Sequence, residues 1–343
     1  MRTFIGILIL SVAPAAEPSK WIEEQGGRVE TDAQSRVTAV RVPFGWVTDA
    51  DLEPISGFKD LQILDLSLSL VSDTGIEKLK NLQNVQDLNL YSVEHITDVA
   101  IAYLRGWQKL QRLNLRGTDI TDTSVQYIGG LTSLKSLDIS YTQVTNNGME
   151  YLAGLRSLEE VSVGGNKVTG AGLRVLRTLP QLTSLNLSGG QKRNSGTWVV
   201  TFTDRDLEVI SQLKRLRSLN LAGMKITDIG LVQLKGLSQL RSLDLGRTQI
   251  TGKGLDSLVA LSTLEELTLW NAKKIDDSAG PALAALKNLK TLDLAETAFG
   301  DGGLANLAAI PGLQRLYLSG SRVTEAGVQA FLRERPECKV SWR

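Results

Sequence analysis

Cysteine and histidine are almost absent from this 343-residue sequence, which contains one of each, Cys338 and His95. A single cysteine cannot form a disulfide framework within the chain or a zinc site built on several cysteine ligands. A single histidine excludes a His-rich metal site and a histidine dyad. We therefore expect no metal and no cofactor, with Cys338 half-buried in the last strand and His95 exposed in a loop.

Charge imbalance and aromatic residues are also scarce, at a formal net charge of +1 and 5% Phe, Trp and Tyr. Proteins that bind phosphate backbones usually carry an excess of basic residues, so we do not expect a nucleic-acid partner. The composition, 42% hydrophobic and 22% charged, is that of a globular protein with ample core material. With so few aromatic residues, that core must be mainly aliphatic.

Long hydrophobic runs are missing beyond the N-terminus. Residues 1–16 read MRTFIGILILSVAPAA, with basic Arg2, an apolar run from Phe4 to Val12 and small residues after it. This is the layout of a secretory signal peptide, and the run is about half of the ~20 residues that a membrane span needs. We expect cleavage and export to the periplasm, the cell surface or the medium, with no membrane span afterwards. The alternatives are an uncleaved anchor and an apolar tail.

A leucine repeat organises the rest of the chain. Successive units are separated by 24 residues nine times, by 25 twice and by 34 once. Each unit opens with Leu-x-x-Leu-x-Leu, an alternation typical of a short strand, and continues with the three-residue spacing of a short helix. One unit cannot bury both apolar faces alone, so the units must stack as a solenoid. The first apolar positions are Val37, Leu61, Val85, Leu110, Leu134, Leu158, Leu182, Leu216, Leu240, Leu264, Leu289 and Leu313.

The consensus L-x-x-L-x-L-x-x-T-x-I-T-D-x-G-L-x-x-L-x-x-L resembles the leucine-rich-repeat family over roughly residues 37–343. Its I-T-D-x-G-L half is similar to the cysteine-containing subclass of F-box proteins. With its signal-like start, the whole chain resembles the exported leucine-rich-repeat proteins of planctomycete bacteria. The resemblance implies an α/β horseshoe, with a parallel sheet of about 13 strands on the concave face and short helices on the convex face.

Threonine stands where the family often has asparagine or cysteine, and we expect it to hydrogen-bond backbone groups of neighbouring coils. These threonines are Thr118, Thr142, Thr248 and Thr297. A Thr-Asp pair recurs before the helical segments, as at Thr121-Asp122 and Thr227-Asp228. We interpret these pairs as helix caps rather than as metal-binding carboxylates, because a Leu-x-x-Leu helix follows each of them. Glycines such as Gly148 and Gly230 should permit close packing of the coils.

We divide the chain into a signal peptide (1–16), an N-terminal cap (17–36), twelve repeats (37–336) and a C-terminal capping strand (337–343). In the cap we expect a helix that Ser19 caps and Gly26-Gly27 end, followed by a hairpin of 28–30 with 36–42. The 34-residue step carries ten extra residues, which place an insertion at 188–202. Its turn-like, basic first part and its apolar TWVVT stretch predict a hairpin on the edge between strand and helix.

The third, fifth and seventh strand positions should point away from the core and line the concave face. Thirteen strands at ~4.8 Å give an arc of roughly 58 Å, long enough for a protein surface or an extended chain. Most of these positions are polar and mildly acidic, as solvation of a sheet requires. Exposed aromatic and arginine side chains are the usual anchors of interfaces. The partner-binding candidates are Tyr91, Arg112, Arg116, Trp198, Trp270 and Tyr317.

We therefore expect a monomeric, exported, non-enzymatic protein-binding module that uses the concave face and the 188–202 loop. An enzyme is disfavoured, because the acidic residues lie on an open sheet rather than in a pocket that could shift their pKa values. One alternative is an F-box-like adaptor, which needs a helical docking segment before the repeats; only about twenty residues lie between the expected signal and the repeats. The other alternative is a glycan-binding or adhesion protein.

Overall fold

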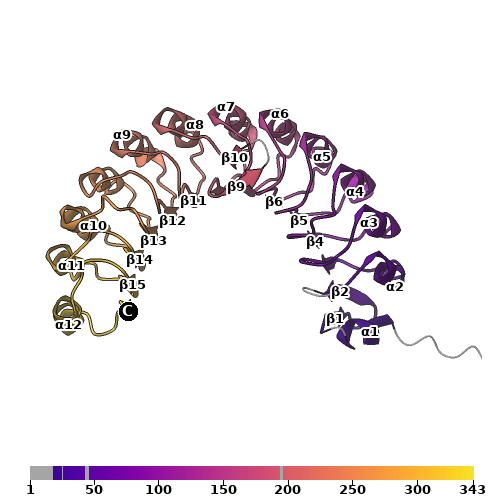
Figure 1. Ribbon diagram of the computed structural model, residues 1–343, viewed down its shortest axis with the longest axis horizontal. Coiled ribbons are helices and arrows are strands. Elements are labelled where there is room, and N and C mark those ends of the chain that lie inside the picture. The colour runs from indigo at the N-terminus through magenta and orange to yellow at the C-terminus, as the bar shows by residue number, and fades with distance from the viewer. Residues whose placement is uncertain (1–17, 25, 43–45, 194–195) are drawn as a thin grey trace, which may run out of the picture.

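The computed structural model describes residues 18–24, 26–42, 46–193 and 196–343. The expected signal peptide lies outside them. The chain forms an open arc with strands along its inner side and helices along its outer side (Figure 1). The predicted horseshoe is therefore confirmed. One hydrophobic core runs along the whole arc between the two layers.

The described residues form a 14-stranded sheet in which thirteen strands, from β2 to β16, are parallel, and β1 pairs antiparallel with β2 as the predicted hairpin. Strands β9 and β10 form a separate antiparallel hairpin. The strands are β1 (Arg28–Thr31), β2 (Val37–Arg41), β3 (Ile63–Asp65), β4 (Asp87–Asn89), β5 (Arg112–Asn114), β6 (Ser136–Asp138), β7 (Glu160–Ser162), β8 (Ser184–Asn186), β9 (Gly190–Arg193), β10 (Gly196–Val199), β11 (Ser218–Asn220), β12 (Ser242–Asp244), β13 (Glu266–Thr268), β14 (Thr291–Asp293), β15 (Arg315–Tyr317) and β16 (Lys339–Ser341).

Short helices cover the convex side. The α-helices are α1 (Pro18–Glu24), α2 (Leu52–Ile55), α3 (Asp73–Leu79), α4 (Asp98–Tyr103), α5 (Asp122–Ile128), α6 (Asn146–Glu150), α7 (Gly170–Leu173), α8 (Leu207–Ser211), α9 (Asp228–Leu231), α10 (Gly280–Ala285), α11 (Asp301–Leu307) and α12 (Glu325–Glu334). Turns of 3₁₀-helix lie at Asp49–Asp51, Leu104–Gly106, Tyr151–Gly154, Arg174–Thr178, Asp204–Asp206, Val232–Gly236, Lys253–Leu258 and Asp277–Ala279.

Each repeat strand after β2 is only three residues long, and its middle residue points into the core. In β5, Leu113 is buried while Arg112 before it is exposed, as the alternation predicts. Leu110 and Leu115 on either side of the strand are also buried. The core is aliphatic with few exceptions; one is the fully buried Trp107, whose indole N–H donates to the Lys80 carbonyl at 3.2 Å. The leucine spacing thus selects which side of every coil faces inward.

Every coil from β3 to β15 turns sharply three residues after its strand, at a residue with a left-handed backbone conformation. Glycine, which adopts this conformation without strain, occupies the position in five coils, at Gly117, Gly165, Gly189, Gly223 and Gly320. The other six coils place a side chain there, at Leu68, Ser92, Tyr141, Arg247, Asn271 and Glu296. We call this side of the solenoid, beyond the carboxyl ends of the parallel strands, the strand-exit edge.

The Thr-Asp pairs cap helices as predicted, and they also join neighbouring coils. The Thr121 hydroxyl accepts a hydrogen bond from the Thr123 N–H at 3.3 Å. The Thr121 backbone N–H and hydroxyl donate to the Asp98 carboxylate of the preceding coil at 2.9 and 2.6 Å. The same pair of bonds links Asp73 to Thr97, Asp122 to Thr145, Asp204 to Thr227, Asp228 to Thr251 and Asp301 to Thr324. We call this series the aspartate ladder.

The glycines in the first helical turns make room for the ladder. A Cβ atom at Gly148 would lie 2.4 Å from the Asp122 carboxylate oxygen, and one at Gly230 would lie 2.3 Å from that of Asp204. The predicted close packing is therefore confirmed. A side chain at either glycine would displace the carboxylate of the preceding coil.

The ladder is interrupted at the insertion. Gly170 stands where an aspartate would follow Thr169, so no carboxylate reaches the next coil. Thr203 instead donates its backbone N–H and hydroxyl to Asp206 of its own coil, both at 2.9 Å. The first repeat uses the same solution, because Thr48 donates to Asp51. The coil after the insertion thus begins a new run of the ladder.

Two local predictions need correction. The turn threonine hydroxyls donate to a carbonyl of their own coil, as Thr118 does to Leu115 at 2.6 Å, and Thr142 also donates to the Asn166 side-chain oxygen of the next coil at 3.3 Å. The turn side chain that reaches the backbone of a neighbouring coil is Asn166, whose amide donates to the Ile139 carbonyl at 2.8 Å, because it is longer than threonine. In the cap, the helix begins at Pro18 instead of after Ser19, since proline is favourable in a first helical turn.

We predict that Asp98→Ala lowers the free energy of unfolding by about 2–4 kcal/mol, because Thr121 and Ser124 lose their shared acceptor. Burial by itself raises the pKa of Asp98, but hydrogen bonds from Ser124 and Thr121 outweigh it and hold this pKa below its ordinary value. The ionised carboxylate therefore stabilises the fold above the unfolded pKa of about 3.9, and that stability is lost as the pH falls through the folded pKa.

Urea unfolding of wild type, Asp98→Ala and Asp98→Asn from neutral to acidic pH tests this prediction. The difference between wild type and Asp98→Asn should shrink at acidic pH. Glu94→Ala, an exposed change in the loop before the same helix, should stay within about 0.5 kcal/mol of wild type. Equal effects of Asp98→Ala and Glu94→Ala would refute the structural role of the ladder.

Candidate functional site

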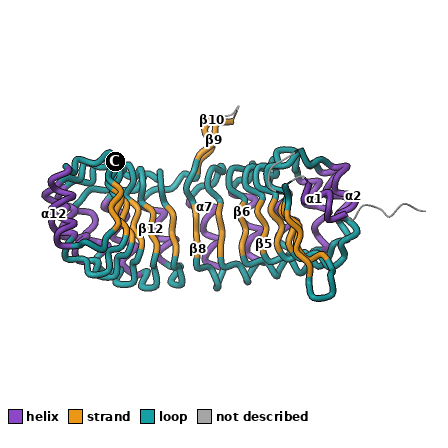
Figure 2. Tube along the Cα trace, turned by 90° about the horizontal axis from the view of Figure 1, so that it is seen from below, coloured by secondary structure: helices purple, strands orange, loops and turns teal. Residues whose placement is uncertain are grey.

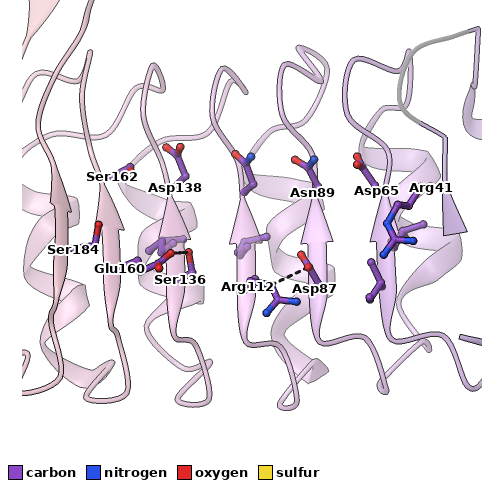
Figure 3. Close-up of a pocket in the computed structure, with 15 residues that line it drawn as sticks. Arg41, Asp65, Asp87, Asn89, Arg112, Ser136, Asp138, Glu160, Ser162 and Ser184 are labelled. Carbon is purple, nitrogen blue, oxygen red and sulfur yellow. Dashed lines mark hydrogen bonds and ion pairs between the residues drawn. The ribbon is translucent and has the colours of Figure 1, made fainter. Parts of the chain in front are cut away.

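A shallow groove crosses the N-terminal half of the concave sheet (Figure 3). It runs from Arg41 in β2 to Ser184 in β8 and has a volume of about 420 Å³. Its polar lining consists of Arg41, Asp65, Asp87, Asn89, Arg112, Asn114, Ser136, Asp138, Glu160, Ser162 and Ser184. All are third- or fifth-position residues, so the predicted columns do line this face.

The charges in the groove are only partly neutralised. Arg112, one of the predicted binding residues, forms an ion pair with Asp87 at 2.8 Å (Figure 3). Arg41 pairs with Glu30 of β1, outside the groove. Three acidic residues, Asp65, Asp138 and Glu160, have no cationic partner among the described ion pairs, although Glu160 accepts a hydrogen bond from Ser136 at 2.9 Å. The groove is therefore acidic overall.

The fifth-position side chains have a structural task. Asp65 accepts a hydrogen bond from the Ser67 backbone N–H at 2.9 Å, and Asn89 accepts one from Tyr91 at 3.1 Å. The same bond recurs at Asn114, Asp138, Asn186, Asn220, Asp244 and Asp293. The side-chain oxygen Oδ1 of aspartate or asparagine accepts this hydrogen bond and stabilises the turn out of the strand, which explains why these residue types fill the column.

Arg116, a second predicted binding residue, belongs to a stack on the strand-exit edge. Its guanidinium lies 4.4 Å from the centre of the Tyr141 ring. The other side of the ring is close to glycines: a Cβ at Gly165 would lie 3.0 Å from the ring, and one at Gly189 would lie 2.5 Å from the tyrosine oxygen. The missing side chains let the ring lie across two coils, reaching the start of the insertion.

The insertion forms a hairpin that projects from this edge, as Figure 2 shows. Its first strand, β9, lies in the part that we predicted to be turn-like. That prediction is wrong for Gly190–Arg193, because pairing with β10 holds the backbone of these residues in an extended conformation. Val200 and Phe202, each 2% exposed, anchor the return of the chain in the core. Trp198 pairs with Gln191 across the hairpin and is half-buried. The predicted hairpin is therefore present, and Trp198 is only partly accessible.

The six predicted residues do not form one cluster. Tyr91, Arg112 and Arg116 lie on or just after β4 and β5, whereas Trp270 and Tyr317 lie in the C-terminal half, beyond the hairpin. Trp270 is 37% exposed and stacks against Arg247 of the preceding coil, with the guanidinium 4.3 Å from the ring centre. The N-terminal group is the better candidate for a binding site, because it lies on or just after two strands, β4 and β5, that the groove crosses.

Sequence reasoning missed several residues on the strand-exit edge. They are the exposed Trp46, Leu68, Leu70 and Arg247, together with the half-buried Tyr141. Three of them, Leu68, Tyr141 and Arg247, occupy the left-handed turn position. The recurrence of glycine there was the available signal, because a large side chain in that column needs another reason to be present.

The described part of the chain does not gather metal-binding side chains. Among the described residues, no cluster of three or more His, Cys, Asp or Glu side chains could hold a metal ion. Cys338 is more deeply buried than predicted, at 4% exposed, and burial raises the pKa of its thiol. In the same part of the chain, no helix is long and apolar enough to cross a bilayer.

Family models now identify the architecture. The leucine-rich-repeat model matches residues 105–168 and 214–273, and a second leucine-rich-repeat model matches residues 285–308. Together with the horseshoe fold, these matches support a leucine-rich-repeat protein. No curated protein sequence matches it significantly.

Solved structures share the fold at low sequence identity. An internalin (inlF) from Listeria monocytogenes aligns with a TM-score of 0.64 at 20% identity, covering 96% of this chain and 95% of that one. Rad7, solved in complex with Elc1 from yeast, aligns with a TM-score of 0.57 at 16% identity, covering 86% and 78%. At such identities the likeness establishes the leucine-rich-repeat fold and no shared ligand.

We predict that Asp244→Asn stabilises the protein at neutral pH by up to about 1 kcal/mol. Burial raises the pKa of Asp244, the Gly246 N–H opposes this, and the charge of Asp293 raises the pKa further. Because the folded pKa lies above the unfolded one, ionisation destabilises the fold as the pH rises past both values. Asparagine, which fills this position at Asn186 and Asn220, keeps the hydrogen-bond acceptor and removes the charge.

Urea unfolding of Asp244→Asn and wild type at pH 7 and at a pH below the ordinary aspartate pKa tests this sign. The gain should be present at pH 7 and nearly absent at the lower pH, where both forms are neutral. A loss of stability at pH 7, or the same gain at both pH values, would contradict the assigned cause.

Proposed function

We propose that this protein is an exported, non-enzymatic binding module that holds a segment of a partner protein along the concave groove and against the hairpin of residues 188–202. Leucine-rich-repeat proteins in general act as protein-interaction modules. The observation that carries the proposal is the position of the groove: it crosses the seven strands from β2 to β8 and ends where the hairpin begins.

The dimensions of the groove favour an extended chain over a small molecule. Seven strands at ~4.8 Å span about 29 Å, the length of roughly nine residues of extended peptide. A volume of about 420 Å³ distributed over that length makes a trough that contacts one side of a ligand without enclosing it. Small-molecule sites instead bury most of the ligand surface.

The two alternatives have less support. Glycan binding usually needs aromatic faces against the ligand, but no aromatic side chain is among the described residues that line the groove. An adaptor role, by analogy with Rad7 in its complex with Elc1, would rest on a likeness at 16% identity that extends to the fold alone.

Affinity capture from the native envelope with three variants tests the binding surface. Ser184→Arg should reduce recovery of a partner at least tenfold by filling the groove beside the hairpin; Arg112 and Arg315 occupy the same strand position, so the fold tolerates arginine there. The double variant Trp198→Ala/Trp270→Ala tests whether the hairpin and the C-terminal part of the strand-exit edge contribute to binding. Ile229→Ser, on the convex side and 77% exposed, is the matched control. Equal recovery by wild type and Ser184→Arg would refute the concave site.

Export is tested by fractionation and N-terminal sequencing of the natural product. We expect a mature chain that begins near Glu17 in the periplasmic, cell-surface or secreted fraction. A full-length cytoplasmic product that retains Met1 would refute export and leave the binding proposal to its own test.

A further inference from the structure

An exposed apolar cluster lies on the strand-exit edge next to the start of the groove. It consists of Trp46, Leu68, Leu70 and Tyr91, whose exposed fractions are 83%, 41%, 49% and 36%. We call these four residues the N-terminal apolar patch. Of the other large exposed apolar side chains, Val99, Tyr151, Ile229, Val232 and Val259 lie on the convex side, and Trp270 and Tyr317 lie in two separate coils of the C-terminal half.

Hydrogen bonds between coils bring the backbones of these residues close together. The Leu70 N–H donates to the carbonyl of Val47, the neighbour of Trp46, at 2.9 Å. The Leu68 N–H donates to the carbonyl of Tyr91 at 2.8 Å. Trp46 and Leu70 occupy the same position, the tenth, in successive repeats, a position that holds polar residues at Asp119, Gln143 and Lys167. The apolar residues are thus adjacent in space and depart together from the pattern of the other coils.

The fold gains little from these side chains. Leu68 has a left-handed φ of 60°, a conformation that costs a leucine roughly 1–2 kcal/mol and that glycine adopts in five equivalent turns. Its side chain is 41% exposed, so burial offsets this strain only in part. Strained, exposed residues that packing does not explain are typical of binding surfaces.

Acidic groups lie beside the patch. Asp65 lies three residues before Leu68 and lines the groove, as do Asp138 and Glu160 farther along (Figure 3). The Arg112 charge is neutralised by Asp87, and Arg41 is paired with Glu30. The groove beside the patch therefore presents an excess of negative charge, which favours a cationic ligand, while Arg116 adds one positive charge on the strand-exit edge.

We propose that the N-terminal apolar patch and the acidic residues Asp65, Asp138 and Glu160 dock an extended cationic segment of a partner protein. One large apolar side chain of the segment would contact the patch, and lysine or arginine side chains would face the acids. Three and four strand steps separate β3 from β6 and β7, about 14 and 19 Å, or roughly four and six residues of extended chain. Residues at those spacings lie on the same side of the segment.

This inference deepens the proposed function and depends on it, because it names the chemistry of the partner for the same groove. A second copy of this chain is a less suitable occupant. A symmetric contact between two patches would bring the two acidic grooves close together, and like charges would oppose it.

The test is selection from a random peptide library long enough to cross the groove, with wild type as the target and Trp46→Ser/Leu70→Ser as the counter-target. Enriched peptides should combine one large apolar residue with lysine or arginine about four to six residues away. A synthetic peptide of the enriched sequence should bind at least tenfold more weakly to Trp46→Ser/Leu70→Ser and to Asp65→Asn/Asp138→Asn, and its affinity should fall with ionic strength. Asparagine serves the same turn bond at Asn89, so the second variant keeps the fold. Ile229→Ser should bind like wild type.

Three outcomes would overturn the inference: enrichment of acidic peptides, failure to enrich any peptide that distinguishes wild type from Trp46→Ser/Leu70→Ser, or a dimer in solution that this variant dissociates. The proposed function fails separately. A natural partner that Ser184→Arg loses and Trp46→Ser/Leu70→Ser retains would keep the concave module and refute the patch, whereas equal recovery of partners by all variants would refute the module itself.

Discussion

Every coil of this solenoid depends on its neighbours to bury the leucines of a three-residue strand and of one or two helical turns. Neither element would be stable alone, because so short a strand or helix exposes most of its apolar surface. The aspartate ladder adds hydrogen bonds between neighbouring coils to this stacking. A carboxylate such as Asp98 accepts hydrogen bonds from the next coil, and the small residue beside it leaves the space. The ladder breaks at Gly170, where the hairpin emerges.

Structural roles of this kind also limit which residues are available for binding. The fifth-position aspartates and asparagines of the concave face already stabilise their own turns, so the turn explains their presence, and only the excess charge to which Asp65 and Asp138 contribute bears on a ligand. What distinguishes one region from another is the third position, with its arginines and serines, and the strand-exit edge. There the N-terminal half combines an acidic groove, the Arg116–Tyr141 stack and the hairpin.

The repeat count predicted the thirteen parallel strands, their register and the buried face of each coil, because burial of Leu113 and its equivalents follows directly from spacing. The capping threonines and the hairpin of the insertion were also predictable from local residue types. Other contacts were not. The partner of the Thr121 hydroxyl is a carboxylate 23 residues away, and the ring of Tyr141 lies over glycines of two later coils. Neither contact can be inferred from the sequence of a single repeat.

The sequence by itself determined the architecture, since a 24-residue leucine period allows only stacked coils with strands on one side and helices on the other. It also marked the insertion as the largest departure from that period. Only the tertiary structure decided which exceptional residues lie together. Stacking brings Trp46, Leu68, Leu70 and Tyr91 into one patch beside Asp65, although the sequence spreads them over 46 positions from Trp46 to Tyr91. The same stacking places Tyr91 far from Trp270 and Tyr317. The physical reason is that neighbours across a solenoid are set by strand spacing of about 4.8 Å, not by distance along the chain.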